Sequence, residues 1–243
     1  MNTNSAIKTL NLTKFFTSKG NPILAVDEVT MDISQGEIFG LMGPNGAGKT
    51  TLLKILTTLL LPSSGEAYVS GYSIREEDKV KGSIGVISSE ERSFYWRLTG
   101  RENLRFFATL HNLKPSEIKR RIESITGTLG LKDFLDRRFD SYSTGMKQKL
   151  LIARSLIGNP MVLFIDELTR GLDPVAASQI RESLKTLSSN GITIFLITHS
   201  IEEAIEVCER VAIMYQGSIK ATIRPGEVEL KDFMIETIGG RID

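Results

Sequence analysis

The sequence is poor in cysteine and in long apolar runs. Its single cysteine, Cys208, excludes an internal disulfide bond. Helical spacing around this residue predicts a buried, reduced thiol rather than a reactive one. The longest apolar segments, residues 55–61 and 161–165, are far shorter than the ~20 residues needed to cross a bilayer. Any role at a membrane would therefore depend on a partner.

An excess of charge is also missing, because 30 Lys and Arg residues are balanced by 29 Asp and Glu residues and the net charge is +1. Nothing in the overall charge indicates a nucleic-acid partner. The opening residues, MNTNSAIKTLNL, contain neither a basic nor an apolar signal-peptide region, so we expect a cytoplasmic protein. A globular chain of 243 residues buries roughly 70–75% of its unfolded surface, which is enough for a stable core.

The pattern of apolar residues predicts an α/β fold. Strands alternating with helices after residue 160 favour a mainly parallel sheet covered on both faces. The predicted strands are residues 6–12, 23–33, 37–42, 82–87, 161–165, 191–198, 210–215 and 218–223, with an extended segment at 63–74. The predicted helices are one that follows residue 48, then 99–113, 114–131, 133–139 and 143–158, and two near 175–189 and 200–208.

A glycine loop between a predicted strand and a predicted helix is the first segment with a chemical signature. Residues 43–50, GPNGAGKT, fit the pattern GxxxxGK followed by Ser or Thr, whose backbone N–H groups and helix dipole bind phosphate oxygens. Lys49 is expected to reach the terminal phosphates, and the Thr50 hydroxyl to ligate Mg²⁺. The expected nucleotide contacts are Gly43, Pro44, Asn45, Gly46, Ala47, Gly48, Lys49, Thr50 and Thr51.

Three polar residues follow predicted strands at the same edge of the sheet. Asp166 and Glu167 end the apolar run MVLFIDE, where Asp166 is suited to hold Mg²⁺ and Glu167 to orient an attacking water. His199 follows the strand GITIFLIT and is suited to donate a hydrogen bond to the γ-phosphate. Each has an ordinary alternative: an exposed acidic pair at a strand end, and a histidine that caps a helix or packs in the core.

Three further segments resemble the ATP-binding subunit of ATP-binding-cassette (ABC) transporters. They are YSTGMKQKL at 142–150, DELTRGLDP at 166–174 and THS at 198–200, in the order of that family's signature, D-loop and switch histidine. The resemblance implies a single domain over residues 1–243 with a P-loop NTPase core. It implies an ATP-binding core with an N-terminal antiparallel β subdomain over 1–88 and 159–243, and a helical signature subdomain over 89–158.

The same resemblance implies an Mg²⁺-dependent ATPase that works as a dimer. Ser143, Thr144 and Gly145 would contact the ATP bound to a second copy of the subunit, and Lys49, Glu167 and His199 would be catalytic. Near the start of the chain, the segment LNLTKFF resembles the family's aromatic contact to adenine. The resemblance assigns this contact to Phe16, or less favourably to Phe15. A phenylalanine that packs in the core is the alternative there. A separate transmembrane permease subunit would hold the protein at the cytoplasmic face of the membrane.

One departure from the family lies in SSEERSFYW, residues 88–96. The family has a glutamine here that contacts Mg²⁺, and this chain offers Ser89 or Glu90 in its place. Ser89 is favoured, because an added carboxylate would repel the γ-phosphate. The aromatics Phe94, Tyr95 and Trp96 are expected either to dock a permease or to pack the helical segment onto the core.

The residues LTGRENLRFF, 98–107, further resemble the branch that exports drugs, lipids or polysaccharides with separate membrane subunits. Two other functions stay open. The first is a soluble ABC-type ATPase without a permease, in iron–sulfur assembly or translation. The second is a small-molecule kinase, which shares the phosphate loop but leaves YSTGM and GLDP unexplained.

Overall fold

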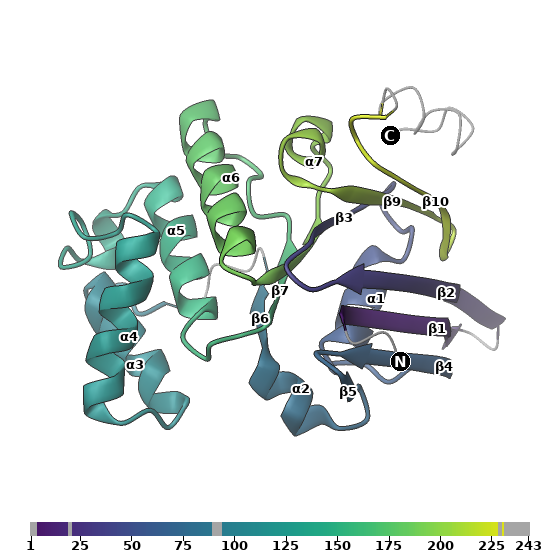
Figure 1. Cartoon of the computed structure of the whole chain (residues 1–243), viewed down its shortest axis with the longest axis horizontal. Helices are drawn as coiled ribbons and strands as arrows, with labels where there is room; N and C mark the ends of the chain where they lie inside the picture. The colour runs from purple at the N-terminus through teal and green to yellow at the C-terminus, as the bar shows by residue number, and fades with distance from the viewer. Residues whose placement is uncertain (1–3, 19–20, 89–93, 228–229, 231–243) are drawn as a thin grey trace.

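The computed structural model describes residues 4–18, 21–88, 94–227 and 230. The described part contains two sheets (Figure 1). The antiparallel sheet has the order β2-β1-β4-β5, from β1 (Ser5–Ser18), β2 (Asn21–Ser34), β4 (Ser64–Val69) and β5 (Tyr72–Ser73). The larger sheet has the order β10-β9-β3-β8-β7-β6, from β3 (Ile38–Met42), β6 (Ile84–Ile87), β7 (Val162–Asp166), β8 (Thr193–Ile197), β9 (Arg210–Tyr215) and β10 (Ser218–Ile223).

The larger sheet is parallel except at one edge, where β10 runs antiparallel to β9. Every residue of β3 and β8 is buried, which is the pattern of parallel strands covered on both faces. The predicted α/β class, with its mainly parallel sheet and antiparallel N-terminal strands, is therefore confirmed. Because these strands are parallel, β3, β7 and β8 all end at the same edge of the sheet.

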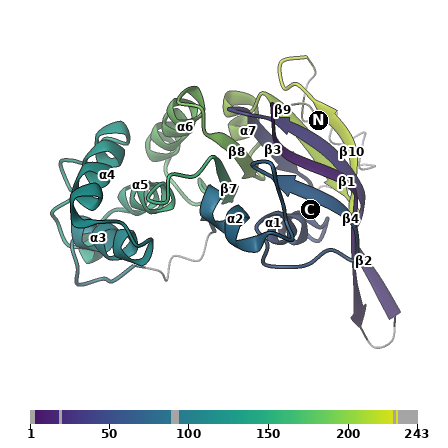
Figure 2. The same cartoon turned by 60° about the horizontal axis from the view of Figure 1, so that its bottom comes forward.

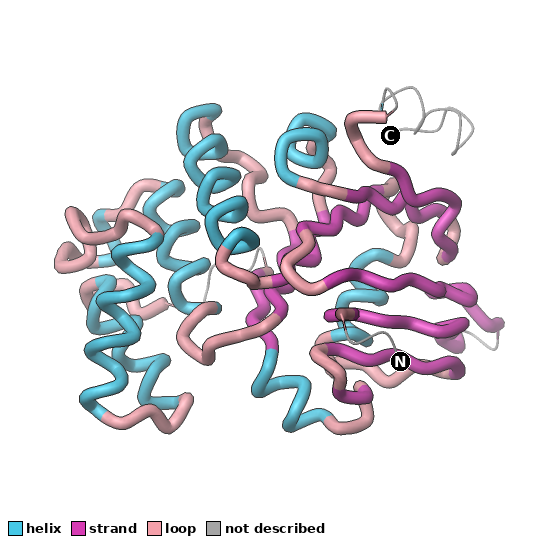
Figure 3. The backbone as a smooth tube through the Cα atoms, viewed as in Figure 1, coloured by secondary structure: helices cyan, strands magenta, loops and turns pink. Residues whose placement is uncertain are grey.

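The helices fall into two groups. Near the sheets are α1 (Lys49–Leu56), α2 (Glu77–Ser83), α6 (Pro174–Ser189) and α7 (Ile201–Val207). The second group is α3 (Gly100–Leu110), α4 (Pro115–Thr128), the short 3-10 helix η1 (Phe139–Ser141) and α5 (Thr144–Ser155). In Figures 1 and 2 α3, α4 and α5 lie at the end of the molecule opposite the antiparallel sheet, and Figure 3 shows most strands on the other side. The division into subdomains at 88 and 159 stays a prediction.

Alternate residues of the central strands face two different cores. Leu163 and Ile165 of β7 join a cluster that includes the second helix group, whereas Phe164 joins a cluster beneath the antiparallel sheet and α1. This period of two is what a pleated strand imposes on a sheet with both faces covered. No helix in the described part of the chain is long and apolar enough to cross a membrane.

Two predicted elements differ from the structure. Residues 133–138 form no helix, because Arg138 forms an isolated β-bridge with Thr99 and the carbonyls of Leu135 and Arg137 accept hydrogen bonds from the first N–H groups of α3 at 2.9 and 3.3 Å. Helix α2 was not expected, and it takes Gly82 and Ser83 from the predicted strand, which begins only at Ile84. Its seven residues are mostly charged and show little apolar periodicity, which hid it from the sequence.

Candidate active site

The phosphate loop joins the end of β3 to the start of α1. Gly43 and Gly48 have φ of 152° and 106°, and a Cβ on either would come within 2.1 Å of a backbone oxygen, of Met214 or of Ala25. Only glycine fits both positions. Gly48 is also the N-cap of α1, and no side chain caps this helix. The first N–H groups of α1 are therefore available to an anion, which is the usual phosphate site at a helix start.

Lys49 lies across this loop. Its residue is 6% exposed, and its Nζ donates to the Gly43 and Pro44 carbonyl oxygens at 2.7 and 2.9 Å. Burial lowers the pKa of Lys49, and the carboxylates of Glu167 and Asp166 partly offset the effect. The ammonium group is thus held at the loop, near both carboxylates of the predicted catalytic centre.

Asp166 is the last residue of β7 and is half-buried. Burial, followed by the neighbouring Glu167 carboxylate, raises the pKa of Asp166, whereas Lys49, His199 and a hydrogen bond from the Thr50 side chain lower it. The structure therefore brings the Thr50 hydroxyl to the Asp166 carboxyl. Hydroxyl and carboxylate are the hard oxygen donors that Mg²⁺ prefers, and it takes only one or two from the protein. These residues fit the ion that the sequence predicts.

Glu167 connects the ends of two strands. It has a φ of 57°, and its N–H donates to the Ile197 carbonyl of β8 at 3.0 Å. A left-handed conformation costs a non-glycine residue roughly 1–2 kcal/mol, so the surrounding contacts must hold it. Its Oε1 lies 2.9 Å from Nε2 of His199, which follows β8. The predicted meeting of Glu167 and His199 at one sheet edge is confirmed as geometry, while their catalytic roles stay predictions.

The second oxygen of Glu167 has a partner that the sequence analysis missed. Nη1 of Arg170 lies 2.9 Å from Oε2 of Glu167, although the Arg170 side chain is 81% exposed. Their spacing of three residues is the only sequence signal for this pair. Both residues and His199 line a cavity of 570 Å³ that opens beside the phosphate loop at Asn45.

The predicted signature residues lie at the start of α5. Ser143 is its N-cap, and its Oγ accepts the Met146 N–H at 3.3 Å. Ser143 and Thr144 are exposed, and a Cβ on Gly145 would meet the Ala176 Cβ at 3.0 Å, because α5 and α6 approach closely. Among the described residues that line the 570 Å³ cavity, none belongs to this segment. The structure of one chain therefore leaves the predicted signature open to solvent.

Phe16 lies on β1 opposite Ile23 and is 40% exposed. Nζ of Lys14 sits 5.3 Å from the centre of its ring. The ring is thus not packed in the core, which leaves a face for the predicted adenine contact. Ser89 and Glu90, the two alternatives for the Mg²⁺-contacting loop residue, lie outside the described residues.

The aromatic residues that follow divide into two kinds. Phe94 is buried and its ring packs 4.8 Å from that of Phe139, as the packing alternative predicted. Tyr95 and Trp96 are 50% and 56% exposed, as a docking surface requires, and the Tyr95 ring packs 4.8 Å from that of the partly exposed Phe106. Phe94 therefore packs the segment onto the core, whereas docking through Tyr95 and Trp96 stays a prediction.

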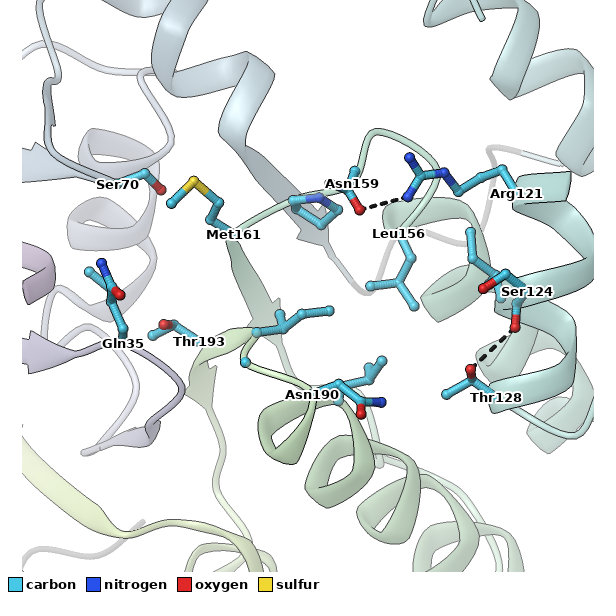
Figure 4. A pocket seen from close by; sticks show the side chains of 16 residues that line it. Gln35, Ser70, Arg121, Ser124, Thr128, Leu156, Asn159, Met161, Asn190 and Thr193 are labelled. Carbon is cyan, nitrogen blue, oxygen red and sulfur yellow. Dashed lines mark hydrogen bonds between the residues drawn. The ribbon is translucent and has the colours of Figure 1, made fainter. Parts of the chain in front are cut away.

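A second cavity, of 380 Å³, lies away from these loops, between α4 and the starts of β7 and β8 (Figure 4). Nη1 of Arg121 donates across it to Oδ1 of Asn159 at 2.6 Å. Helices α5 and α6 end at the cavity, with Leu156 and Asn190 as their C-caps. The negative ends of the two helix dipoles offset the positive charge of the Arg121 guanidinium. The cavity therefore favours neither an anionic nor a cationic ligand.

Comparison with known proteins decides the family. Residues 26–170 match the family model described as ABC transporter, a stretch that holds the phosphate loop, the signature and Asp166–Glu167. The chain belongs to the ABC transporter family. Its match to the ABC transporter ATP-binding protein NatA of Bacillus subtilis is 38% identical over 84% of this chain and 83% of NatA. This ABC protein also resembles the probable multidrug ABC transporter ATP-binding protein YbhF of Escherichia coli, at 35% identity over 89% of this chain but 37% of YbhF.

Solved structures agree with this assignment. The structure of cbiO1 from Clostridium perfringens, described as part of the ABC transporter complex cbiONQ, aligns with 98% of this chain. The identity is 27% and the TM-score is 0.86. The structure of the ATP-binding cassette MJ0796, a dimer bound to ADP and Pi, aligns with 90% of this chain. The identity is 26% and the TM-score is 0.77. The P-loop ABC fold that the sequence predicted is therefore confirmed, whereas Phe16 and His199 lie outside the matched range of the family model.

Proposed function

We propose that this ABC protein is the ATP-binding and ATP-hydrolysing subunit of a membrane transporter. ATP hydrolysis by a water that Glu167 orients drives the separation of an ATP-bound dimer. The observation that carries the proposal is the placement of Glu167, whose carboxylate meets His199 at 2.9 Å beside the phosphate loop. A small-molecule kinase shares the phosphate loop, but it would not account for the segments YSTGM and GLDP or for the match to the ABC transporter family model.

ATP binding begins at the phosphate loop. The unpaired N–H groups at the start of α1 receive the phosphates, and Lys49 exchanges its two loop carbonyls for phosphate oxygens. Asp166 and Thr50 would hold Mg²⁺, which when bound neutralises phosphate charge and orients the terminal phosphoryl group. Phe16 stacks on adenine through its exposed ring face.

Hydrolysis requires that Glu167 exchange its present partners. Its Oε2 leaves Arg170 and accepts a hydrogen bond from the attacking water, which the carboxylate aligns with the γ-phosphate. His199, bonded to the same carboxylate through Nε2, turns that N–H toward the γ-phosphate oxygens as charge develops on them. The products are ADP and phosphate.

A second copy of the chain completes the site. Ser143 and Thr144 are exposed at the start of α5, and the N-terminal dipole of this 12-residue helix favours an anion. Each chain has one phosphate loop and one such segment, so a head-to-tail homodimer lets each cover the other's ATP. The dimeric MJ0796 cassette supports this arrangement.

The membrane partner is a separate permease subunit, which holds the protein at the cytoplasmic face. The support is the exposed pair Tyr95 and Trp96 and the likeness to cbiO1, part of a transporter complex. Export is the favoured direction, because YbhF is described as a probable multidrug transporter protein. A soluble ATPase without a permease is the alternative, and these exposed aromatics disfavour it.

The test of hydrolysis is Glu167→Gln, which keeps the size and removes the charge. We expect this variant to bind ATP, to hydrolyse it at least ~100-fold more slowly, and to accumulate as an ATP-bound dimer in size-exclusion chromatography. Glu123→Gln, at an exposed position of α4, is the matched control. Full turnover by Glu167→Gln would refute the assignment of the catalytic carboxylate.

The test of the permease is affinity purification of the tagged chain from detergent-solubilised membranes of its own cells. We expect a protein with several apolar segments of ~20 residues to co-purify. Recovery with ribosomes or a soluble scaffold, and never with membranes, would favour the soluble alternative.

A further inference from the structure

Four charged side chains form a ladder between helices α6 and α7, which lie side by side (Figure 1): Arg181 and Lys185 on α6, and Glu202 and Glu206 on α7. Nη2 of Arg181 lies 3.4 Å from Oε1 of Glu202, and its Nε lies 2.5 Å from Oε2 of Glu206, an ion pair without the angle of a hydrogen bond. Nζ of Lys185 lies 3.4 Å from Oε1 of Glu206. The ladder therefore ties both turns of α7 to α6.

Arg181 is the member of the ladder that reaches the proposed catalytic centre from α6. Its side chain is 9% exposed, and it lines the cavity of 570 Å³ together with Glu167 and His199. The Lys185 side chain is 40% exposed, and it is not among the described residues that line this cavity. The two cations thus differ in burial, and of the two only Arg181 borders the site.

Burial makes Arg181 an inefficient source of stability. A buried guanidinium loses its hydration, which offsets much of its attraction to a carboxylate. The side chains of its partners Glu202 and Glu206 are 77% and 34% exposed, so water can solvate both carboxylates when the guanidinium is removed. The planar guanidinium instead has directed donors, and contact with two side chains fixes the positions of both. The ladder is therefore better suited to set geometry than to add stability.

The two helices begin where the proposed catalytic segments end. Helix α7 begins at Ile201, two residues after His199, and α6 begins at Pro174, seven residues after Glu167. A helix as short as the seven residues of α7 is not stable alone, so its position depends on its contacts with the rest of the chain. These contacts are the packing of its buried apolar side chains and the ladder. A change in the ladder therefore moves the start of α7, next to His199.

We propose that Arg181 is a positioning residue, whose guanidinium holds α7 against α6 and thereby keeps the His199 imidazole at hydrogen-bond distance from Glu167. Nε2 of His199 and Oε1 of Glu167 are 2.9 Å apart, and a displacement of α7 by about 1 Å is enough to break this contact. The inference rests on the proposed ATPase function, and it assigns no contact between Arg181 and ATP.

The first test compares Arg181→Met with Lys185→Met. Methionine keeps an unbranched side chain and removes the charge at both positions. For Arg181→Met we expect kcat of ATP hydrolysis to fall about tenfold with KM for ATP unchanged, because misplaced groups slow the chemical step while the phosphate loop still binds ATP. Lys185→Met, one turn farther along α6, should keep the wild-type kcat. Wild-type kcat in Arg181→Met, or equal losses in the two variants, would overturn the proposal.

Arg181→Lys and Glu206→Gln provide the test if Arg181→Met does not fold. Lysine keeps the positive charge, but its single ammonium group lacks the two-armed fork of the guanidinium. Glutamine keeps the size of Glu206 and removes its charge. We expect each variant to lower kcat about threefold at unchanged KM, since each keeps part of the ladder. A wild-type kcat in both variants, or a raised KM with a normal kcat, would contradict the positioning role.

The proton NMR signals of the imidazoles test the position of His199 without hydrolysis. The chain has two histidines, and the spectrum of His111→Gln assigns their signals. Without nucleotide, we expect the His199 signal to shift in Arg181→Met and to stay in place in Lys185→Met, while the His111 signal is constant in both. If the wild-type protein does not hydrolyse ATP, the proposed function fails and this spectrum still decides the inference. An unshifted His199 signal in Arg181→Met would disprove it.

Discussion

Both oxygens of the Glu167 carboxylate are occupied in the single chain, one by His199 and one by Arg170. The two contacts differ in strength. His199 is fixed at the end of β8, whereas the Arg170 side chain is 81% exposed, and ion pairs of this kind contribute at most about 1 kcal/mol. Arg170 therefore restrains the catalytic carboxylate weakly, and Lys49, with two loop carbonyls at hydrogen-bond distance, is restrained more strongly.

Arg170→Ser should consequently raise the rate of ATP hydrolysis, by no more than about fivefold, because 1 kcal/mol corresponds to that factor. The measurement is steady-state phosphate release at saturating ATP, with Arg105→Ser on α3 as an exposed control. A tenfold loss of activity would show instead that the guanidinium assists the reaction.

Cys208 should be unreactive in the folded protein. It is 7% exposed, and burial, with smaller contributions from the nearby carboxylates of Glu203 and Glu209, raises the pKa of its thiol, so the nucleophilic thiolate is scarce. With one cysteine in the chain, titration with a chromogenic disulfide gives a single signal. We expect one equivalent to react in denaturant and almost none in buffer on the same timescale. Complete reaction within mixing in buffer would contradict the burial of this residue.

At the scale of elements, the sequence predicted where the candidate site residues lie wherever chemistry and local geometry coincide, while their roles stay predictions. The phosphate loop needs glycines within eight residues, and β7 ends at Asp166 and is followed by Glu167, two carboxylates that the buried strand cannot hold. The failures come from distant contacts. Residues 133–138 lose their predicted helix to the start of α3, whose first N–H groups bind two of their carbonyls. A pattern read along one segment contains no information about such partners.

The start of α3 offers a test of local sequence signals. Thr99 accepts the Glu102 N–H, and the Glu102 carboxylate accepts the Thr99 N–H at 2.8 Å, a complete capping box. We expect Thr99→Ala to lower the free energy of unfolding by about 1 kcal/mol in urea titration. Ser116→Ala, on the exposed face of α4, should change it by less than about 0.5 kcal/mol. Equal effects of the two substitutions would mean that the box adds no stability.

At the scale of the whole molecule, one sheet joins the catalytic centre to the second helix group. Leu163 of β7 and Leu104 of α3 belong to the same buried cluster, so a displacement of α3 is transmitted through packed side chains to the strand that ends at Asp166. The segment 94–98 enters this cluster through Phe94 and presents Trp96 to solvent. Nζ of Lys147 on α5, the helix that begins with the signature, lies 5.0 Å from the Trp96 ring centre. A permease docked on Trp96 would thus contact side chains that lead both to the strand ending at Asp166 and to the helix that begins with the signature.

Trp96→Ala and Phe94→Ala separate docking from packing, because the two side chains differ in burial. Phe94 is 6% exposed, and its loss should lower the free energy of unfolding by about 3–5 kcal/mol. Trp96 is 56% exposed, so its loss should cost about 1 kcal/mol or less. If Trp96 anchors the permease, its loss costs at least ~2 kcal/mol of binding, a roughly 30-fold weaker complex in co-purification. Unfolding of Trp96→Ala to the extent of Phe94→Ala would assign this residue to packing, and undiminished recovery of the permease would place the docking surface elsewhere.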